Sequence, residues 1–321
     1  MANKFIISLS PHVHGNDSVQ RNMYGVCIAL VPALICSLYY FGIGAAIVLA
    51  TSVLACVFFE WAINKFILRN DKVTITDGSA ILTGLLLGFN LPSNLPIWII
   101  FIGALVAIGV GKMTFGGLGC NPFNPALGGR IFLLISFPVL MTDWTAPASF
   151  FGAAIDATSG ATPLALVKEA VAAGTPISEI FANNPSLSYS QLLFARVGSA
   201  GEVSAIALLL GFVYLLVRRV IKPHITLSIW ATVFVFSGIL WLCNPEQFTD
   251  PIFNLLTGGM LLGSIFMATD YVTSPMSDKG MVIFGVGIGK KFGEKYKTSA
   301  EIIGGCILIL IGIKVLLEYV I

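Results

Sequence analysis

Long runs of apolar residues, separated by short polar connections, occupy most of this chain. Since a helix of about 20 apolar residues spans a bilayer, the pattern predicts an all-α polytopic membrane protein with about ten transmembrane helices. Pro92 ends the third run and Pro138 interrupts the fifth, so we expect broken or re-entrant segments. The approximate cores of the runs are 23–41, 43–66, 79–92, 95–111, 129–141, 199–217, 225–243, 252–268, 279–291 and 300–320.

Residues 112–130 interrupt the apolar pattern with a stretch rich in glycine and proline. Such a composition is incompatible with regular helix. Irregular backbone at membrane depth is tolerated where it is buried in protein or lines a cavity. The stretch is therefore a candidate cradle for a cofactor or an ion.

A weak internal repeat relates the two halves of the chain. Leu82-Thr83-Gly84 followed by Gly88 resembles Leu256-Thr257-Gly258 followed by Gly263, and Gly128-Gly129 resembles Gly304-Gly305 at a similar offset. Five spans in each half is an odd number, so the second half would enter the membrane upside down, as in many carriers. We expect two inverted five-helix repeats, 23–141 and 198–321, joined by a long loop over 142–197.

Composition supports the membrane assignment and excludes other classes. The 321 residues are 56% hydrophobic and 11% charged, with a mean hydropathy of +0.91, whereas soluble domains carry roughly 25% charged residues. The net charge of +2 gives no indication of a nucleic-acid partner. Residues 1–22 are expected to be a polar leader, not a cleaved secretory signal, because they have no long apolar core.

Lysine and arginine in the connections predict the orientation. Most lie on one side of the membrane if the N-terminus is cytoplasmic, which places 142–197 on the outer side. Four lysines would lie on the outer side, against this majority: Lys290, Lys291, Lys295 and Lys297. Either the ninth segment is re-entrant or these lysines meet an acidic partner.

Cysteine, histidine and glycine patterns argue against several sites within this chain. The six cysteines form no CxxC pair, so disulfides and a purely local metal centre are not expected, although a site shared with another subunit stays open. The three histidines occupy polar or loop positions. Gly285, Gly287 and Gly289 lack phosphate-loop and dinucleotide spacing and favour close helix packing. NAD and iron–sulfur clusters, if used, would belong to partner subunits.

The predicted outer loop contains a small-residue turn that ends in a hydroxyl. Residues 156–162 read Asp-Ala-Thr-Ser-Gly-Ala-Thr and precede a helical-looking segment that begins at Pro163. One interpretation makes Thr162 an ordinary helix N-cap, with proline at the first helical position. The other uses the free N–H groups and positive dipole end of the same helix to favour a phosphate beside Thr162. The two interpretations are compatible.

Three acids lie at or near membrane depth, where ionisable groups often mark ion pathways or proton relays. Glu60, Glu202 and Asp270 are therefore candidates for coupling Na⁺ or H⁺ to function. Each also has a purely structural interpretation: Glu60 as an interfacial snorkelling residue, Glu202 as an acid at the start of the sixth span, and Asp270 as the cap of a turn.

Asn121 and Asn124 lie in the run Asn-Pro-Phe-Asn-Pro-Ala. Asn-Pro pairs initiate turns and can cap broken half-helices. Asn124-Pro125-Ala126 also matches the signature of water channels, but those channels use two copies and the sequence contains one. Each of the two amides can donate and accept hydrogen bonds at once.

The motif Asp-x-x-Ser-Gly-Ala-Thr resembles the flavin-attachment motif of a family of membrane redox subunits. That family includes the D subunit of the Rnf ferredoxin:NAD oxidoreductase and the B subunit of the sodium-pumping NADH:quinone oxidoreductase. The likeness covers nearly the whole chain, and the compact size is closer to the Rnf protein. The other matching stretches are 77–84, 116–130, Gly201-Glu202 and Met267-Ala-Thr-Asp270.

The resemblance implies that FMN is joined through its phosphate to Thr162 on the outer side of a bacterial cytoplasmic membrane. Asp156, Ser159, Gly160 and Ala161 would form the recognition turn for a flavin transferase. It also implies noncovalent riboflavin on the cytoplasmic side, for which we select Asn121 and Asn124. The implied partners are a second FMN-bearing subunit and iron–sulfur subunits.

We therefore expect a membrane subunit of an ion-translocating redox complex that relays electrons across the membrane. The alternative is an inverted-repeat transporter or channel with an unmodified Thr162.

Overall fold

The computed structural model describes residues 18–69, 74–147 and 160–293, and within these ranges it contains helices and no β-strand. The last of the ten expected segments, 300–320, lies outside the described residues, together with Gly304 and Gly305. The first-half helices are α1 (Val19–Ala29), α2 (Val31–Ala62), α3 (Ser79–Phe89), α4 (Ile97–Leu105), α5 (Pro125–Ser136) and α6 (Pro138–Thr142).

Two groups of helices follow. The connection between the halves contains α7 (Pro163–Ala172), α8 (Ile177–Asn183) and α9 (Tyr189–Phe194). The second half contains α10 (Ala205–Val217), α11 (His224–Cys243), α12 (Pro251–Leu256), α13 (Met260–Leu262) and α14 (Asp278–Gly293). The part of 142–197 that is described is therefore largely helical, whereas the sequence indicated one helix there.

Three stretches of the described chain are long and apolar enough to cross a membrane: Val19–Ile67, Ile97–Phe115 and His224–Cys243. Shorter apolar helices are α3, α5 and α10. The first stretch is one helical run in which Gly42 breaks the regular geometry with φ 58° and ψ −136°. This position separates the first two predicted segments.

The predicted breaks fall close to their expected places. Phe137 has φ −133° and ψ 57° and separates α5 from α6, as Pro138 indicated. The irregular stretch is shorter than predicted, because α5 begins at Pro125 with an asparagine cap. The sixth segment was placed too early: residues 199–204 are non-helical and α10 begins at Ala205. In the eighth segment, α12 ends before the non-helical residues Thr257–Gly259.

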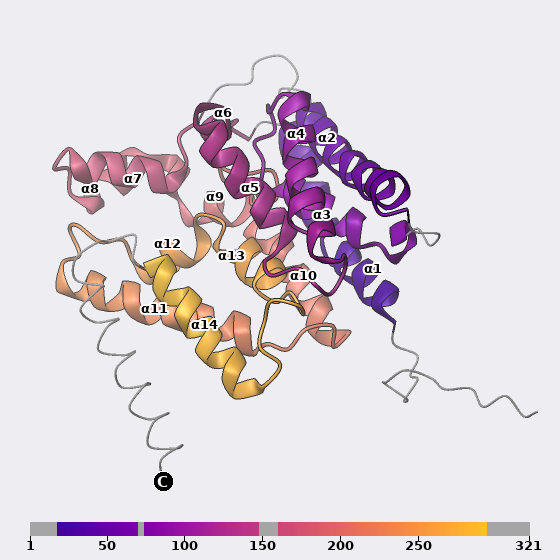
Figure 1. Cartoon of the computed structure of the whole chain (residues 1–321). Helices are drawn as coiled ribbons and strands as arrows, with labels where there is room; N and C mark the ends of the chain where they lie inside the picture. Colours follow the sequence, from indigo (N-terminus) through magenta and orange to yellow (C-terminus); the bar gives the residue numbers. More distant parts are fainter. Residues whose placement is uncertain (1–17, 70–73, 148–159, 294–321) are drawn as a thin grey trace, which may run out of the picture.

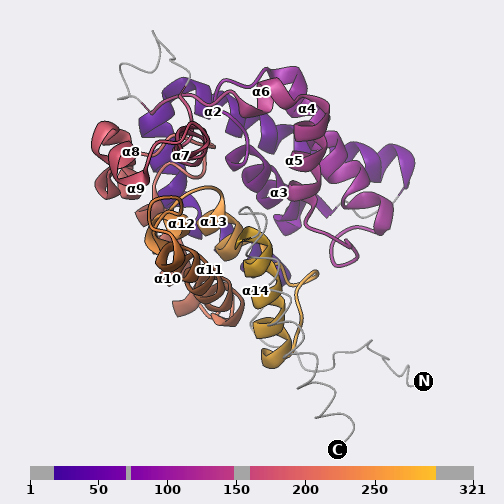
Figure 2. The same ribbon diagram turned by 90° about the vertical axis from the view of Figure 1, so that its left-hand side faces the viewer.

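The helices of the first half lie on one side of the molecule, and α11, α12 and α14 lie on the other (Figures 1 and 2). In the first half α2 packs against α3 and α4, and in the second half α11 packs against α12 and α14. Helix α10 contacts α1 and α2 and joins the halves. A Cβ at Gly211 of α10 would lie 2.3 Å from the Ala29 carbonyl oxygen, so glycine permits this close approach.

Small residues also bring α14 onto α11. A Cβ at Gly289 would lie 2.8 Å from the Thr232 Cβ, and one at Gly285 would overlap Ser228. The predicted packing role is confirmed for these two glycines. Gly287 differs, because a Cβ there would meet nothing within 4 Å.

Helices α7 and α8 lie beside α12 at the end of the molecule near α6 (Figure 1). Their apolar side chains form a small core with the fully buried Phe253 of α12. Leu164, two residues after Thr162, approaches the break in the second half, since its Cδ1 would lie 3.0 Å from a Cβ at Gly258. The position of Thr162 is therefore fixed relative to the membrane helices.

Candidate functional site

Thr162 is the N-cap of α7. Its backbone is extended, with φ −65° and ψ 151°, and its Oγ1 accepts a hydrogen bond from the Ala165 N–H at 3.3 Å. Pro163 follows at the first helical position. The capping interpretation is confirmed, and the same geometry places the hydroxyl at the positive end of the helix dipole.

The residues before Thr162 form a close-fitting turn. The Gly160 N–H donates to the Trp144 carbonyl at 2.8 Å, and a Cβ at Gly160 would lie 3.2 Å from Val197 Cγ1. Ala161 is exposed and Thr162 is half-buried. Asp156 and Ser159, the other two predicted residues of the motif, lie outside the described residues.

A cluster of buried charges surrounds the non-helical residues before α10. The Arg196 side chain is buried, its Nε donates to the Glu202 carbonyl, and its two terminal nitrogens have no hydrogen-bond partner among the described residues. Glu202 is buried as well, and its carboxylate lies beside the break at Gly259. The interpretation of Glu202 as an acid in the first turn of a span is therefore wrong, because it lies outside α10 and in this cluster.

The same cluster is connected to the end of α3. Arg130 of α5 donates to Asn90 Oδ1 at 3.0 Å. Asn90 is the C-cap residue of α3, and its side-chain amide donates to the Leu86 carbonyl at 2.7 Å. The Gly201 N–H donates to the Phe89 carbonyl at 2.9 Å. We call Asn90, Arg130, Arg196 and Glu202 the outer cluster. It joins broken segments from both halves.

Glu60 forms a second buried cluster near the other end of α3. Lys112 Nζ lies 2.6 Å from Glu60 Oε2 and 2.6 Å from Ser79 Oγ. The Ser79 hydroxyl and N–H both contact Asp77 Oδ1. The Glu60 side chain has no exposed surface, so its interpretation as a snorkelling interfacial residue is wrong. We call Glu60, Asp77, Ser79 and Lys112 the inner cluster.

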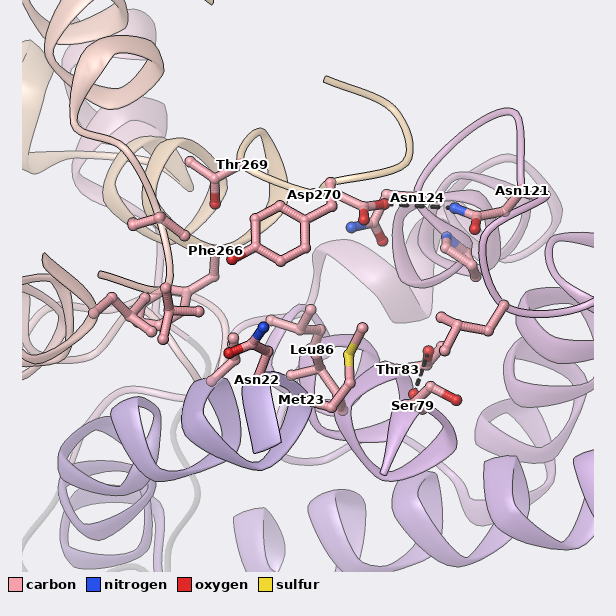
Figure 3. A pocket seen from close by; sticks show the side chains of 18 of the residues that line it. Asn22, Met23, Ser79, Thr83, Leu86, Asn121, Asn124, Phe266, Thr269 and Asp270 are labelled. Atoms are coloured by element: carbon pink, nitrogen blue, oxygen red, sulfur yellow. Dashed lines mark hydrogen bonds between the residues drawn. The ribbon is translucent and has the colours of Figure 1, made fainter. Parts of the chain in front are cut away.

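A cavity lies beside the inner cluster, between α1, α3, the 112–125 stretch and the turn at 269–271. Ser79 and Thr83 line it from α3, and Asn121 and Asp270 line it from the facing segments (Figure 3). Its accessible volume is about 90 Å³. One water needs about 10–15 Å³ of such space. The cavity therefore has room for several waters or a hydrated ion.

Asn121 and Asn124 have different roles around this cavity. Asn121 Nδ2 donates to the Phe123 carbonyl at 3.0 Å and approaches Asp270 Oδ2 at 3.5 Å. Asn124 Oδ1 caps α5 by accepting from the Ala126 N–H at 3.0 Å and the Leu127 N–H. The capping interpretation of Asn124 is confirmed, and its amide oxygen is occupied in that role.

Asp270 also caps a turn, as predicted. Its carboxylate accepts from the Val272 N–H at 3.4 Å and from the Thr273 hydroxyl at 3.5 Å. The carboxylate nevertheless reaches the cavity wall (Figure 3). The structure thus brings Asp270 and Asn121 together, whereas Glu60 lies behind Lys112 and Glu202 lies in the outer cluster.

The amino-acid sequence that forms this site matches a known protein family. The sequence profile of the NQR2, RnfD, RnfE family matches residues 6–292. The chain belongs to this family. The match includes Thr162, both charged clusters and the cavity.

Curated relatives extend the NQR2, RnfD, RnfE assignment. The chain is 41% identical over 287 residues to the D subunit of a proton-translocating ferredoxin:NAD(+) oxidoreductase complex from Clostridium ljungdahlii, covering 89% of this chain and 85% of the relative. It is 38% identical over 283 residues to the D subunit of a Na(+)-translocating ferredoxin:NAD(+) oxidoreductase complex from Acetobacterium woodii, covering 88% and 82%. The D subunit of an ion-translocating oxidoreductase complex from Rhodobacter capsulatus is 39% identical over 294 residues, covering 87% and 82%.

Sequence reasoning missed the residues that partner the predicted acids. Lys112 and Arg130 entered the prediction only as charges that flank the 112–130 stretch and indicate orientation, and no role was predicted for Arg196. A signal for Lys112 was present, since a lysine beside a Gly/Pro-rich break at membrane depth needs an acidic partner. The partner of Arg196 comes from the fold of a non-helical loop, which residue spacing does not reveal.

Proposed function

We propose that this chain is the D-type membrane subunit of an ion-translocating ferredoxin:NAD⁺ oxidoreductase complex and carries FMN as a phosphoester on Thr162. The membrane-subunit role follows from the family and from relatives that are similar over more than four fifths of their length. The single observation that supports attachment at Thr162 is its position as the N-cap of α7, which places the hydroxyl of this half-buried residue at the helix N-terminus.

The residues around Thr162 fit a tethered phosphate. A phosphoester at Oγ would lie at the end of a helix whose first N–H groups favour negative charge. Gly160 has little room for a side chain on the Val197 side, so the turn is held close to the protein. Bound FMN would supply one-electron and two-electron redox chemistry. The protein would position the tether next to the outer cluster through Leu164 and Gly258.

We also propose that noncovalent riboflavin binds near Asn121 and Asn124, although the size of the cavity there limits how it could fit. Ligand pockets commonly enclose about 300–1,000 Å³, and the cavity has an accessible volume of about 90 Å³ in this conformation. A flavin ring would therefore require side chains to move. Asn121 is the better candidate, because the Asn124 amide oxygen caps α5.

Coupling to ion movement would use the two halves of the membrane domain. The proposal of inverted repeats is supported by the similar packing of α2 on α3 and α4 and of α11 on α12 and α14. Electron transfer would bias two arrangements of the halves and so expose an ion site to alternate sides. This requires that ion affinity differ between the oxidised and reduced states, because a ligand shifts an equilibrium only by its differential affinity.

In-gel flavin fluorescence after denaturation tests the attachment site. The chain is produced with a flavin transferase, and Thr162→Asn is compared with wild type. Asparagine can still cap α7 but lacks a hydroxyl, so the variant should fold and its band should lose fluorescence. Thr175→Ala, in the same connection, should keep it. Fluorescence retained in Thr162→Asn would show that the flavin is attached elsewhere.

The alternative, a transporter or channel without a redox cofactor, gives a different result in the same experiment. The wild-type band would then be dark even when the transferase is present and active on a known substrate protein.

The orientation of the chain in the membrane is tested separately. Labelling of single cysteines in intact cells should place α7 outside and the 112–124 stretch inside.

A further inference from the structure

The ion pair between Lys112 and Glu60 is almost completely buried. The two side chains are 3% and 0% exposed, and their charged atoms are 2.6 Å apart. Removing two charges from water is costly, and replacing such a pair by apolar residues is often neutral or stabilising. Ionisable groups at membrane depth usually serve ion or proton movement. The pair therefore needs a functional explanation.

The position of the pair relative to the cavity indicates what that function is. Lys112 and Ser79 line the cavity, whereas Glu60 is not among its lining residues. The Lys112 ammonium thus stands between the Glu60 carboxylate and the space that can hold a hydrated ion. A cation that enters from the cavity meets Asp270 and Asn121 on one wall and Ser79 on the other (Figure 3). Lys112 donates a hydrogen bond to this serine and lines the cavity as well.

We propose that Lys112 is a tethered cation that occupies the binding position of a translocated monovalent cation at Glu60. An ion from the cavity can bind Glu60 only when the ammonium moves away, so Lys112 and the ion compete for one carboxylate. The ligand is a monovalent cation, Na⁺ or H⁺. The inference rests on the proposed function to the extent that the complex must move such an ion.

The surroundings provide a second position for the ammonium. Lys112 already donates to the Ser79 hydroxyl at 2.6 Å, and that hydroxyl contacts Asp77, which is half-buried. Movement towards Asp77 would keep the lysine paired while Glu60 takes up the ion. Once the ammonium has moved, oxygen atoms of Glu60 and Ser79 would face the ion, as Na⁺ and other hard cations prefer. Cys56 lies nearby, buried on α2 one turn before Glu60.

The test uses the purified whole complex with variants of this subunit. Binding of ²²Na⁺ is measured directly, and ferredoxin-dependent NAD⁺ reduction is measured against Na⁺ concentration and pH. Lys112→Met removes the competitor. If the lysine blocks the site nine-tenths of the time, the apparent cation affinity should rise about tenfold. For protons, the same change moves the activation profile about one pH unit to the alkaline side.

Control variants separate this role from a structural one. Lys222→Met removes a second lysine ion pair, the 2.6 Å pair with Asp278 that is more than half exposed, and should leave cation affinity unchanged. Glu60→Gln with Lys112→Met removes both charges, so it should assemble even if Lys112→Met alone does not. We expect this double variant to lose coupled ion transport.

Two outcomes would overturn the inference. One is unchanged cation affinity for both Na⁺ and H⁺ in an assembled Lys112→Met complex. The other is wild-type ion transport by the double variant, which would make the pair purely structural. Flavin fluorescence is recorded on the same samples. A dark wild-type band would reject the proposed function without changing the result for cation binding.

Discussion

Gly84 sets the distance between α3 and α2, and its replacement by alanine should destabilise the membrane domain. A Cβ at this position would lie 2.6 Å from the Val53 Cα and 2.9 Å from the Ser52 carbonyl oxygen. Since carbon atoms pack best at about 3.5–4.0 Å, α3 must move away from α2 by roughly 1 Å. Backbone atoms line this contact, so no side chain can rotate to relieve the strain.

The magnitude follows from three contributions. Overpacking of this kind costs about 1–3 kcal/mol. The Ser52 hydroxyl donates to the Gly84 carbonyl at 2.8 Å, and stretching this hydrogen bond costs about 1 kcal/mol. Alanine gains about 1 kcal/mol over glycine in helix propensity. The net loss is therefore about 1–3 kcal/mol.

Unfolding of the purified subunit in mixed micelles, titrated with a denaturing detergent and followed by tryptophan fluorescence, measures this loss. Gly287→Ala is the matched control, because it changes a helical glycine on α14 that has open space around it. It should stabilise by about 0.5–1 kcal/mol. If Gly84→Ala were as stable as Gly287→Ala, the inferred close contact between α2 and α3 would be wrong.

Three further changes test other parts of the structure. Asn124→Ala removes the cap of α5 and should cost about 0.5–2 kcal/mol in the same titration; Asn124→Ser should recover most of it. Asn90→Leu removes the amide oxygen that accepts from the Arg130 guanidinium and should destabilise more than Asn124→Ala, whereas an equal or smaller loss would show that the outer cluster is solvated. Lys222 holds the pKa of Asp278 below its usual range, so that pair stabilises above the unfolded pKa of aspartate and its contribution is lost as pH falls through the lower folded value. The effect of Lys222→Met on thermal unfolding should therefore disappear in acid and at about 1 M salt, where the Debye length is about 3 Å.

Hydrophobic patterning predicted where apolar helices occur but not how each begins or ends. The segment 225–243 was found as α11 to within one residue, because a continuous apolar run without a proline break determines it. The segment 199–217 was misplaced, because Ala200 and Gly201 are apolar yet bind the end of α3 through backbone hydrogen bonds. A local pattern cannot distinguish an apolar helix from an apolar loop that completes a neighbouring helix.

Site prediction succeeded where one residue and its local backbone carry the role. The caps at Thr162 and Asn124 follow from short motifs, and both are present. The partners of Glu60 and Glu202 could not be predicted in this way. Lys112 is 52 positions from Glu60, and such pairs form only after several helices have packed.

Helix α3 connects the two charged clusters physically. Ser79, its first residue, belongs to the inner cluster, and Asn90, its C-cap, belongs to the outer cluster. Eleven residues of helix place them about 16 Å apart, and Gly84 fixes the helix against α2 between them. If α3 moves as a rigid unit, a displacement at Asn90 would be transmitted to Ser79 and hence to the Lys112–Glu60 pair. Any coupling between a redox group near the outer cluster and an ion at the inner cluster therefore has a continuous path through α3, and Gly84→Ala should alter both clusters at once.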